Sequence, residues 1–118
     1  MLRDRQALLD IIKATQQVLD YAQDLTQIEL CQNDEKQAAI LYRLIIIGEA
    51  TKRLSTDFRD QYSTIPWRQM AGLRDVVIHD YDELDTNILW NVITLNLPGI
   101  LWMLQILLSQ LDPGAITD

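Results

Sequence analysis

The sequence DEKQAAILYRLIIIGEATKRL, residues 34–54, carries two apolar stripes at helical spacing. One stripe is Ala38-Leu41-Tyr42-Ile45, and the second is Ile40-Leu44-Ile47-Thr51-Leu54. A helix that is apolar on two sides must be covered on two sides, so this segment should lie in the middle of a helical bundle. Asn33 or Asp34 is expected to cap its N-terminus. The stretch therefore predicts an all-α fold.

A second long helix and a short one are predicted before this segment. Apolar residues recur on one helical face from Asp4 to about Asp24, with polar residues on the other face. Thr26 and Glu29 have the spacing of a capping box, so a short helical turn is expected before Asn33.

The second half of the chain predicts two or three more helices. Residues 55–66 form a polar connector, and a third long helix should run from Trp67 to about Ile78, with Pro66 at its start. Asp85 is expected to cap a fourth helix, and Pro98-Gly99 marks either a break before a fifth helix or a kink in one continuous helix. We expect an up-and-down bundle of four to five helices in a single domain, residues 1–118.

Composition and charge restrict the function. The only cysteine, Cys31, cannot form an intramolecular disulfide, and residues 1–5 lack the apolar run of a signal peptide, so we expect a cytoplasmic protein. The net charge is −7, and all ten Lys and Arg lie within residues 1–74. This balance argues against tight nonspecific binding of nucleic acid, although it leaves room for a local basic cleft around Arg74.

Residues 86–111 contain no charged side chain. Repeated polar residues and the lack of flanking basic residues argue against a membrane span. An apolar helix of this kind is buried on most sides, so part of it is expected to face a second subunit. We therefore expect a homodimer buried through six apolar residues, namely Ile88, Leu89, Val92, Leu101, Trp102 and Leu108.

The candidate site is Arg74-Asp75-Val76-Val77-Ile78-His79-Asp80-Tyr81, which contains the only histidine. Histidine suits proton transfer near neutral pH, and an arginine fork can grip two phosphate oxygens. Positions five apart on a helix differ by roughly 140°, so one unbroken helix cannot align Arg74 with His79. Either the helix ends near Ile78 and the chain swings His79 back, or a second copy completes the site. Alternatively, both residues only stabilise the third helix.

Glu49 continues the first apolar stripe, where a carboxylate needs a partner or solvent. Either it pairs with Arg74, or it lies at the edge of the stripe and reaches water. The sequence has no glycine-rich phosphate loop, zinc-ligand spacing or Ser/His/Asp arrangement, which argues against those classes of site.

These residues resemble the HEPN-domain toxins of bacteria and archaea, of the HepT type, whose helical bundles bear an Arg-x4-His-x-Tyr motif. Here the motif is Arg74, His79 and Tyr81. The resemblance covers essentially the whole chain in the right order. It extends to Ile46-Ile47-Gly48-Glu49-Ala50, Ile65-Pro66-Trp67, Val77-Ile78-His79-Asp80-Tyr81 and Leu97-Pro98.

The resemblance implies a metal-independent endoribonuclease without a cofactor, the toxin of a type VII-like toxin–antitoxin pair. It further implies a homodimer with both motifs near the two-fold axis, an RNA substrate, and a nucleotidyltransferase antitoxin that transfers AMP to Tyr81. Arg74 and His79 would be catalytic, with Asp75 and Glu49 in support. The family often has Asn after the motif arginine, and Asp75 here adds negative charge. The alternatives are a non-catalytic nucleotide- or substrate-binding subunit of a nucleotidyltransferase, and a structural helical adaptor.

Overall fold

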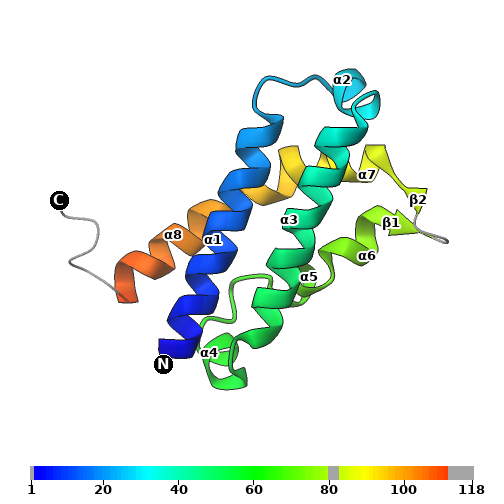
Figure 1. Ribbon diagram of the computed structural model, residues 1–118. Coiled ribbons are helices and arrows are strands. Elements are labelled where there is room, and N and C mark those ends of the chain that lie inside the picture. Colours follow the sequence, from blue (N-terminus) through cyan, green and yellow to red (C-terminus); the bar gives the residue numbers. More distant parts are fainter. Residues whose placement is uncertain (1, 80–82, 112–118) are drawn as a thin grey trace.

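The computed structural model describes residues 2–79 and 83–111, which are mostly helical (Figure 1). Two long helices, α1 (Leu2–Ala22) and α3 (Asp34–Arg53), run antiparallel and pack along most of their length. The short helix α2 (Gln27–Cys31) lies in the connection between them. The predicted all-α class is therefore confirmed.

The predicted caps of α2 and α3 are present. Thr26 Oγ1 accepts a hydrogen bond from the Glu29 N–H, and Glu29 Oε1 accepts one from the Thr26 N–H at 2.9 Å, which completes the capping box. Asn33 caps α3, because its side-chain oxygen accepts from the Lys36 N–H at 2.9 Å. Both caps satisfy N–H groups that have no partner inside their own helix.

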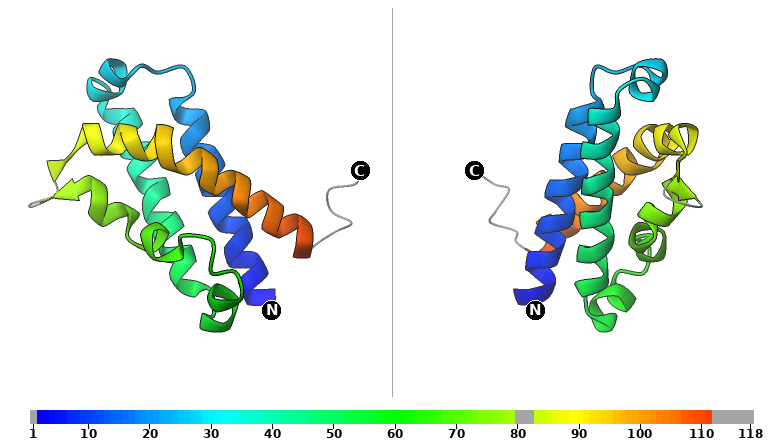
Figure 2. Two further views of the ribbon diagram at one scale, coloured as in Figure 1. Left: turned by 180° about the vertical axis from the view of Figure 1, so that it is seen from behind. Right: turned by 45° about the vertical axis from the view of Figure 1, so that its right-hand side comes forward.

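The last quarter of the described chain is one long helix with an irregular turn inside it. The helix α7 (Thr86–Asn91), the π-helical turn η2 (Val92–Asn96) and α8 (Leu97–Leu111) cross the α1–α3 pair obliquely (Figure 2). The π turn precedes Pro98, which lacks an N–H and crowds the carbonyl four residues earlier, so a wider turn accommodates it. Of the two possibilities at Pro98, the continuous helix is correct.

Asp85 caps this helix, and its Oδ1 accepts a hydrogen bond from the Ile88 N–H at 3.0 Å. By length and composition alone, the helix Thr86–Leu111 could cross a membrane. In the structure, 39% of its most apolar 18-residue segment is buried against the rest of the chain. The oblique crossing also means that a simple up-and-down bundle of four to five helices does not describe the chain. Three long segments form the frame, and short helices complete it.

Two predictions for residues 55–78 were wrong in detail. The polar connector contains a helix, α4 (Thr56–Gln61), because Ser55 caps it and Phe58 is buried in the core. The third long helix is divided at Gly72 into α5 (Trp67–Ala71) and α6 (Leu73–Val77). Glycine has the lowest helix propensity after proline, which favours the division at this position.

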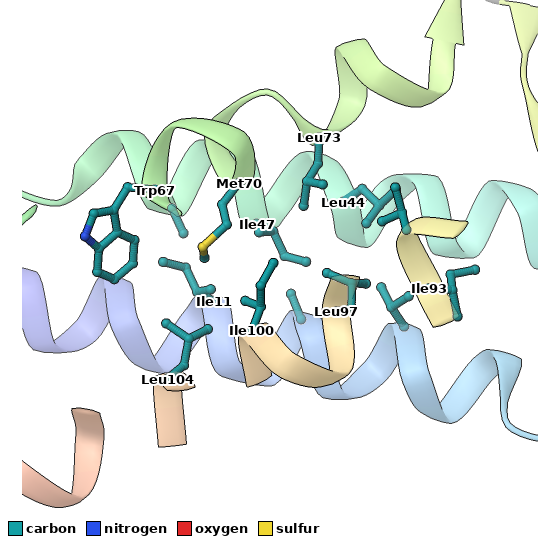
Figure 3. Close-up of a cluster of buried hydrophobic side chains, with 14 of the residues drawn as sticks. Ile11, Leu44, Ile47, Trp67, Met70, Leu73, Ile93, Leu97, Ile100 and Leu104 are labelled. Carbon is teal, nitrogen blue, oxygen red and sulfur yellow. The ribbon is translucent and has the colours of Figure 1, made fainter. Parts of the chain in front are cut away.

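The core lies between α1, α3, α5–α6 and the late helices (Figure 3). Ile11 from α1, Ile47 from α3, Met70 from α5 and Leu97 from α8 all point into it. The second stripe of α3 is buried throughout, as predicted, whereas Tyr42 of the first stripe is 57% exposed. Both α1 and α5–α6 pack against α3, so α3 has neighbours on two sides as predicted, but its first stripe is only partly covered in the single chain.

The late helices are also more deeply buried within the chain than predicted. Leu89, Val92 and Leu101 belong to the core of the chain itself, and Ile88 and Leu108 are half-buried. Of the six residues expected to face a second subunit, Trp102 is strongly exposed. This helix crosses both α1 and α3 obliquely, so it buries more of its surface than a helix at the edge of an up-and-down bundle would.

A buried carboxylate joins the start of α1 to the start of α4. The oxygens of Asp4 accept hydrogen bonds from the Ser55 N–H at 2.7 Å and from the Ser55 hydroxyl at 2.8 Å. Burial opposes ionisation of this carboxyl, but the Ser55 hydrogen bonds and the charge of Arg3 leave the pKa of Asp4 below its ordinary value of 3.8. The contact holds the turn after α3 in place.

The helices α3 and α5 approach each other closely at Gly48. A Cβ atom at this position would lie 3.0 Å from the Ala71 carbonyl oxygen, whereas a Cβ at Gly99 would meet nothing within 4 Å. Only a residue without a side chain allows the two backbones to lie at this distance without displacement. Gly48 therefore sets the distance between α3 and the segment that carries Arg74.

We predict opposite effects for Gly48→Ala and Gly99→Ala. Alanine inside a helix is normally more stable than glycine by about 0.5–1 kcal/mol, so Gly99→Ala should raise the free energy of unfolding. At Gly48 an overpacking cost of about 1–3 kcal/mol should offset or exceed that gain. Denaturant unfolding of both variants tests this, and equal stabilisation by the two would contradict the close approach.

Candidate functional site

Arg74 lies on α6 at the edge of a surface depression of about 320 Å³ between α3 and α5–α6. Gly48, Glu49, Lys52 and Asp75 also line this depression. The Arg74 side chain is 48% exposed, and its Nη1 lies 3.3 Å from Asp75 Oδ1. Solvated ion pairs of this kind contribute only about 0–1 kcal/mol, so a phosphate could displace the carboxylate at low cost.

Glu49 belongs to the same depression but is not a buried carboxylate. Its side chain is 68% exposed, and its Oε1 lies 3.9 Å from Lys52 Nζ, one helical turn further along α3. Of the two possibilities for Glu49, the one in which it lies at the edge of the stripe and reaches solvent agrees with the structure. Two cations, Arg74 and Lys52, therefore face two carboxylates, Glu49 and Asp75, around the depression.

The chain leaves the helix between Arg74 and His79. The helix α6 ends at Val77, and Ile78 is extended with φ −110° and ψ 122°. The strand β1 (Ile78–His79) then pairs antiparallel with β2 (Glu83–Leu84), with His79 opposite Glu83. Of the alternatives for this spacing, the one in which the helix ends near Ile78 agrees with the structure. Tyr81, with its neighbours Asp80 and Asp82, lies outside the described residues, so its expected place is untested.

Both ends of this hairpin are anchored to the core. The Asp85 N–H donates to the Val77 carbonyl oxygen at 2.7 Å, and the Val77 side chain is fully buried. Asp85 also caps α7, so the same residue joins the end of α6 to the start of the long late helix. The backbone of His79 is therefore attached to two core helices.

A second and larger depression, of about 730 Å³, also borders α5, and sequence reasoning missed it. Arg59 of α4 and Arg68 of α5 line it, and Ala71 lines both depressions. The prediction missed Arg59 because residues 55–66 were assigned to a connector. One feature of the sequence does predict this helix. Ser55 is a residue type that caps helices, and it stands three residues before the apolar Phe58, whose N–H donates to the Ser55 hydroxyl in the structure.

Comparison with known proteins identifies the class. The family described as "Ribonuclease HepT-like" matches residues 11–105, which include all three long helical segments in whole or in part and the Arg74 and His79 positions. The chain therefore belongs to the HepT-like ribonuclease family. No solved structure shows a significant match.

Several curated relatives from archaea cover most of the chain. A protein of Methanocaldococcus jannaschii named "Putative RNase MJ1380" is 34% identical over 99 residues, 83% of this chain and 91% of the relative. A second protein of that organism, "Putative RNase MJ0127", is 31% identical over 108 residues, 92% of this chain and 89% of the relative. The "Probable ribonuclease HepT" of Thermococcus cleftensis is 32% identical over 93 residues, 79% of this chain and 84% of the relative.

Proposed function

We propose that the chain is a metal-independent endoribonuclease that acts as the toxin of a type VII-like toxin–antitoxin pair. Family membership carries this proposal, and the names of the relatives support it. The exposed Arg74 at the 320 Å³ depression, followed by an extended segment with His79, offers suitable groups for the chemistry. We further propose that the protein acts in the cytoplasm, where its RNA substrate would be found.

Cleavage of RNA without a metal uses the 2′-hydroxyl of the substrate as nucleophile. A base removes the 2′-OH proton, the oxygen bonds to phosphorus, the bond from phosphorus to the 5′-oxygen breaks, and an acid protonates that oxygen. In this proposal Arg74 binds the phosphate with two parallel N–H···O bonds and stabilises its growing charge. His79 transfers one of the two protons.

A single histidine per chain cannot serve conveniently as base and acid at once, so the second proton-transfer group is proposed to come from a second copy. The exposed part of the first α3 stripe favours this arrangement. Tyr42 is 57% exposed, and Ile45 of the same stripe lines the depression that contains Arg74. A dimer formed through this stripe would bring two Arg74 sites close to the two-fold axis.

Two substitutions of similarly exposed aromatic residues test the dimer. Tyr42→Glu should place a charge in the proposed interface and convert the dimer to a monomer at micromolar concentration, with loss of RNA cleavage. The late helix that the sequence predicted to face a second subunit keeps Trp102 as its strongly exposed member, at 65%. Trp102→Glu should leave the dimer intact if the dimer forms through α3, and should break it if the interface expected from the sequence is correct. Sedimentation velocity measures both. A wild-type protein that sediments as a monomer would remove the composite site.

We predict that His79→Ala reduces RNA cleavage by about 10²- to 10⁴-fold, the typical loss when an acid–base group is removed. Arg74→Ala should reduce it by about 10²- to 10³-fold, the typical loss when a group that stabilises the developing charge is removed. Arg74→Lys should recover little activity, because an ammonium lacks the planar fork. Lys13→Ala, an exposed cation on α1, serves as the control. Circular dichroism and cleavage assays on the purified protein provide the measurement.

The assignment fails if either alanine variant cleaves RNA at the wild-type rate or does not fold. If the folded wild-type protein binds RNA or nucleotides but cuts nothing, the non-catalytic binding subunit is the better description. The Asp75 carboxylate beside Arg74 is the observation that favours this second candidate, because it competes with phosphate for the guanidinium.

Tyr81 is the proposed point of regulation by a nucleotidyltransferase antitoxin. Its phenol oxygen would attack the α-phosphorus of ATP, forming a phosphodiester to AMP, losing its proton and releasing pyrophosphate. The added phosphate and base would then compete with RNA for Arg74. Inhibition would follow from occupancy of the site, without unfolding.

We predict that co-expression with the partner adds the mass of AMP to the peptide containing Tyr81 and removes cleavage activity. Tyr81→Phe should retain activity but escape this inhibition, because it lacks the acceptor oxygen. Tyr21→Phe, on α1, serves as the control at another tyrosine. Intact-mass and peptide mass spectrometry measure the modification. A Tyr81→Phe toxin that the partner still neutralises, with no AMP on the wild type, would contradict the proposal.

A further inference from the structure

The 730 Å³ depression beside α5 contains two arginines. Arg59 reaches it from α4 and Arg68 from α5, and the neutral side chains of Ser63 and Gln69 line it as well. Among residues 2–79 and 83–111, neither arginine forms an ion pair. In a chain of net charge −7, a depression lined by two such cations differs from the average surface.

Arg59 also has an unmet hydrogen bond. Its Nε is buried, and no atom of the described residues accepts a hydrogen bond from it. A buried donor without an acceptor is costly, at about 1–3 kcal/mol in general, and native proteins contain few of them. Rotation of this long side chain toward an anion in the depression would provide the missing acceptor.

The position of the depression connects it with the candidate site. Ala71 lines both this depression and the one that contains Arg74, so the two lie on either side of the same residue. Arg68 on α5 and Arg74 on α6 are six residues apart, on either side of the break at Gly72. Because both arginines line depressions that adjoin at Ala71, a strand that advances about 3.4 Å per nucleotide would connect them within a few nucleotides.

We infer that the Arg59–Arg68 depression binds the phosphate backbone of single-stranded RNA that extends from a phosphate held at Arg74. This inference rests on the proposed ribonuclease function. Arginine forks are suited to phosphate, and backbone contacts of this kind position a strand without reading its sequence. Asp60 also lines the depression, and its carboxylate lowers the net charge there to about +1, so we expect moderate affinity that depends on salt.

Binding of RNA that cannot be cleaved tests the inference separately from catalysis. A 2′-O-methyl RNA of 12 nucleotides and random sequence has no attacking hydroxyl, so its affinity is measurable whether or not the protein is a ribonuclease. Arg59→Gln/Arg68→Gln should raise its Kd about tenfold, because two charged hydrogen-bonding contacts are lost. The slope of log Kd against log salt should fall by about 1.4, at about 0.7 for each lost phosphate contact on a single strand.

The control variant removes the same amount of charge elsewhere. Lys13→Gln/Lys36→Gln changes α1 and the start of α3, whereas Arg59 lies on α4, which follows the other end of α3. The RNA affinity and the salt slope of this control should stay within about twofold of wild type. If the double arginine variant does not fold, Arg68→Gln alone, at an exposed position, should lower the slope by about 0.7. Unchanged Kd and slope in the folded arginine variant would overturn the inference and leave an acidic protein segment as the better occupant.

Discussion

The packing of the second α3 stripe against α1 and α5 is the contact on which the rest of the structure depends. Ile40, Leu44 and Ile47 are completely buried, and each such side chain contributes about 1.5–3 kcal/mol by leaving water. On the neighbouring face of α3, the Ala71 carbonyl oxygen lies only 3.0 Å from the position that a Cβ atom would occupy at Gly48. The position of α5, and through it of Arg74, follows from this one close approach.

The candidate site is carried by structure that is itself irregular. A helix that breaks at Gly72, ends at Val77 and continues into a two-residue strand changes direction twice within a short distance. Such a path is stable here because Leu73 and Val77 are buried and because Asp85 joins the end of α6 to the cap of α7. The backbone at His79 is therefore held by contacts with the core on both sides of it.

Charge around the site is nearly balanced, which has consequences for how it would bind an anion. Arg74 and Lys52 are each accompanied by a carboxylate, Asp75 and Glu49 respectively, in pairs that water screens. An arriving phosphate must compete with these carboxylates. The Arg59–Arg68 depression has one carboxylate for two cations, so it could add the attraction that the Arg74 depression lacks.

The sequence by itself determined the helical class and the caps of α2, α3 and α7, because periodicity and caps are local properties of a chain. The grouping of Arg74 with His79 stays a prediction from a short motif. Because residues five apart cannot share one helical face, it also left a choice between a helix end near Ile78 and a site completed by a second copy, and the structure has the helix end. Residues 55–61 were misassigned because their one local signal, the Ser55 cap, is short, and because the burial of Phe58 depends on contacts with distant segments.

Only the tertiary structure decided that Leu89, Val92 and Leu101 belong to the core of a single chain, that Tyr42 stays exposed, and that Glu49 reaches solvent. It also decided that Arg59 and Arg68 share one depression next to that of Arg74. These outcomes depend on the oblique crossing of the late helix and on the break at Gly72. The crossing angle and the break determine which apolar and charged surfaces come into contact. A crossing angle arises from the packing of complete helix faces against each other, so the sequence of one segment does not predict it.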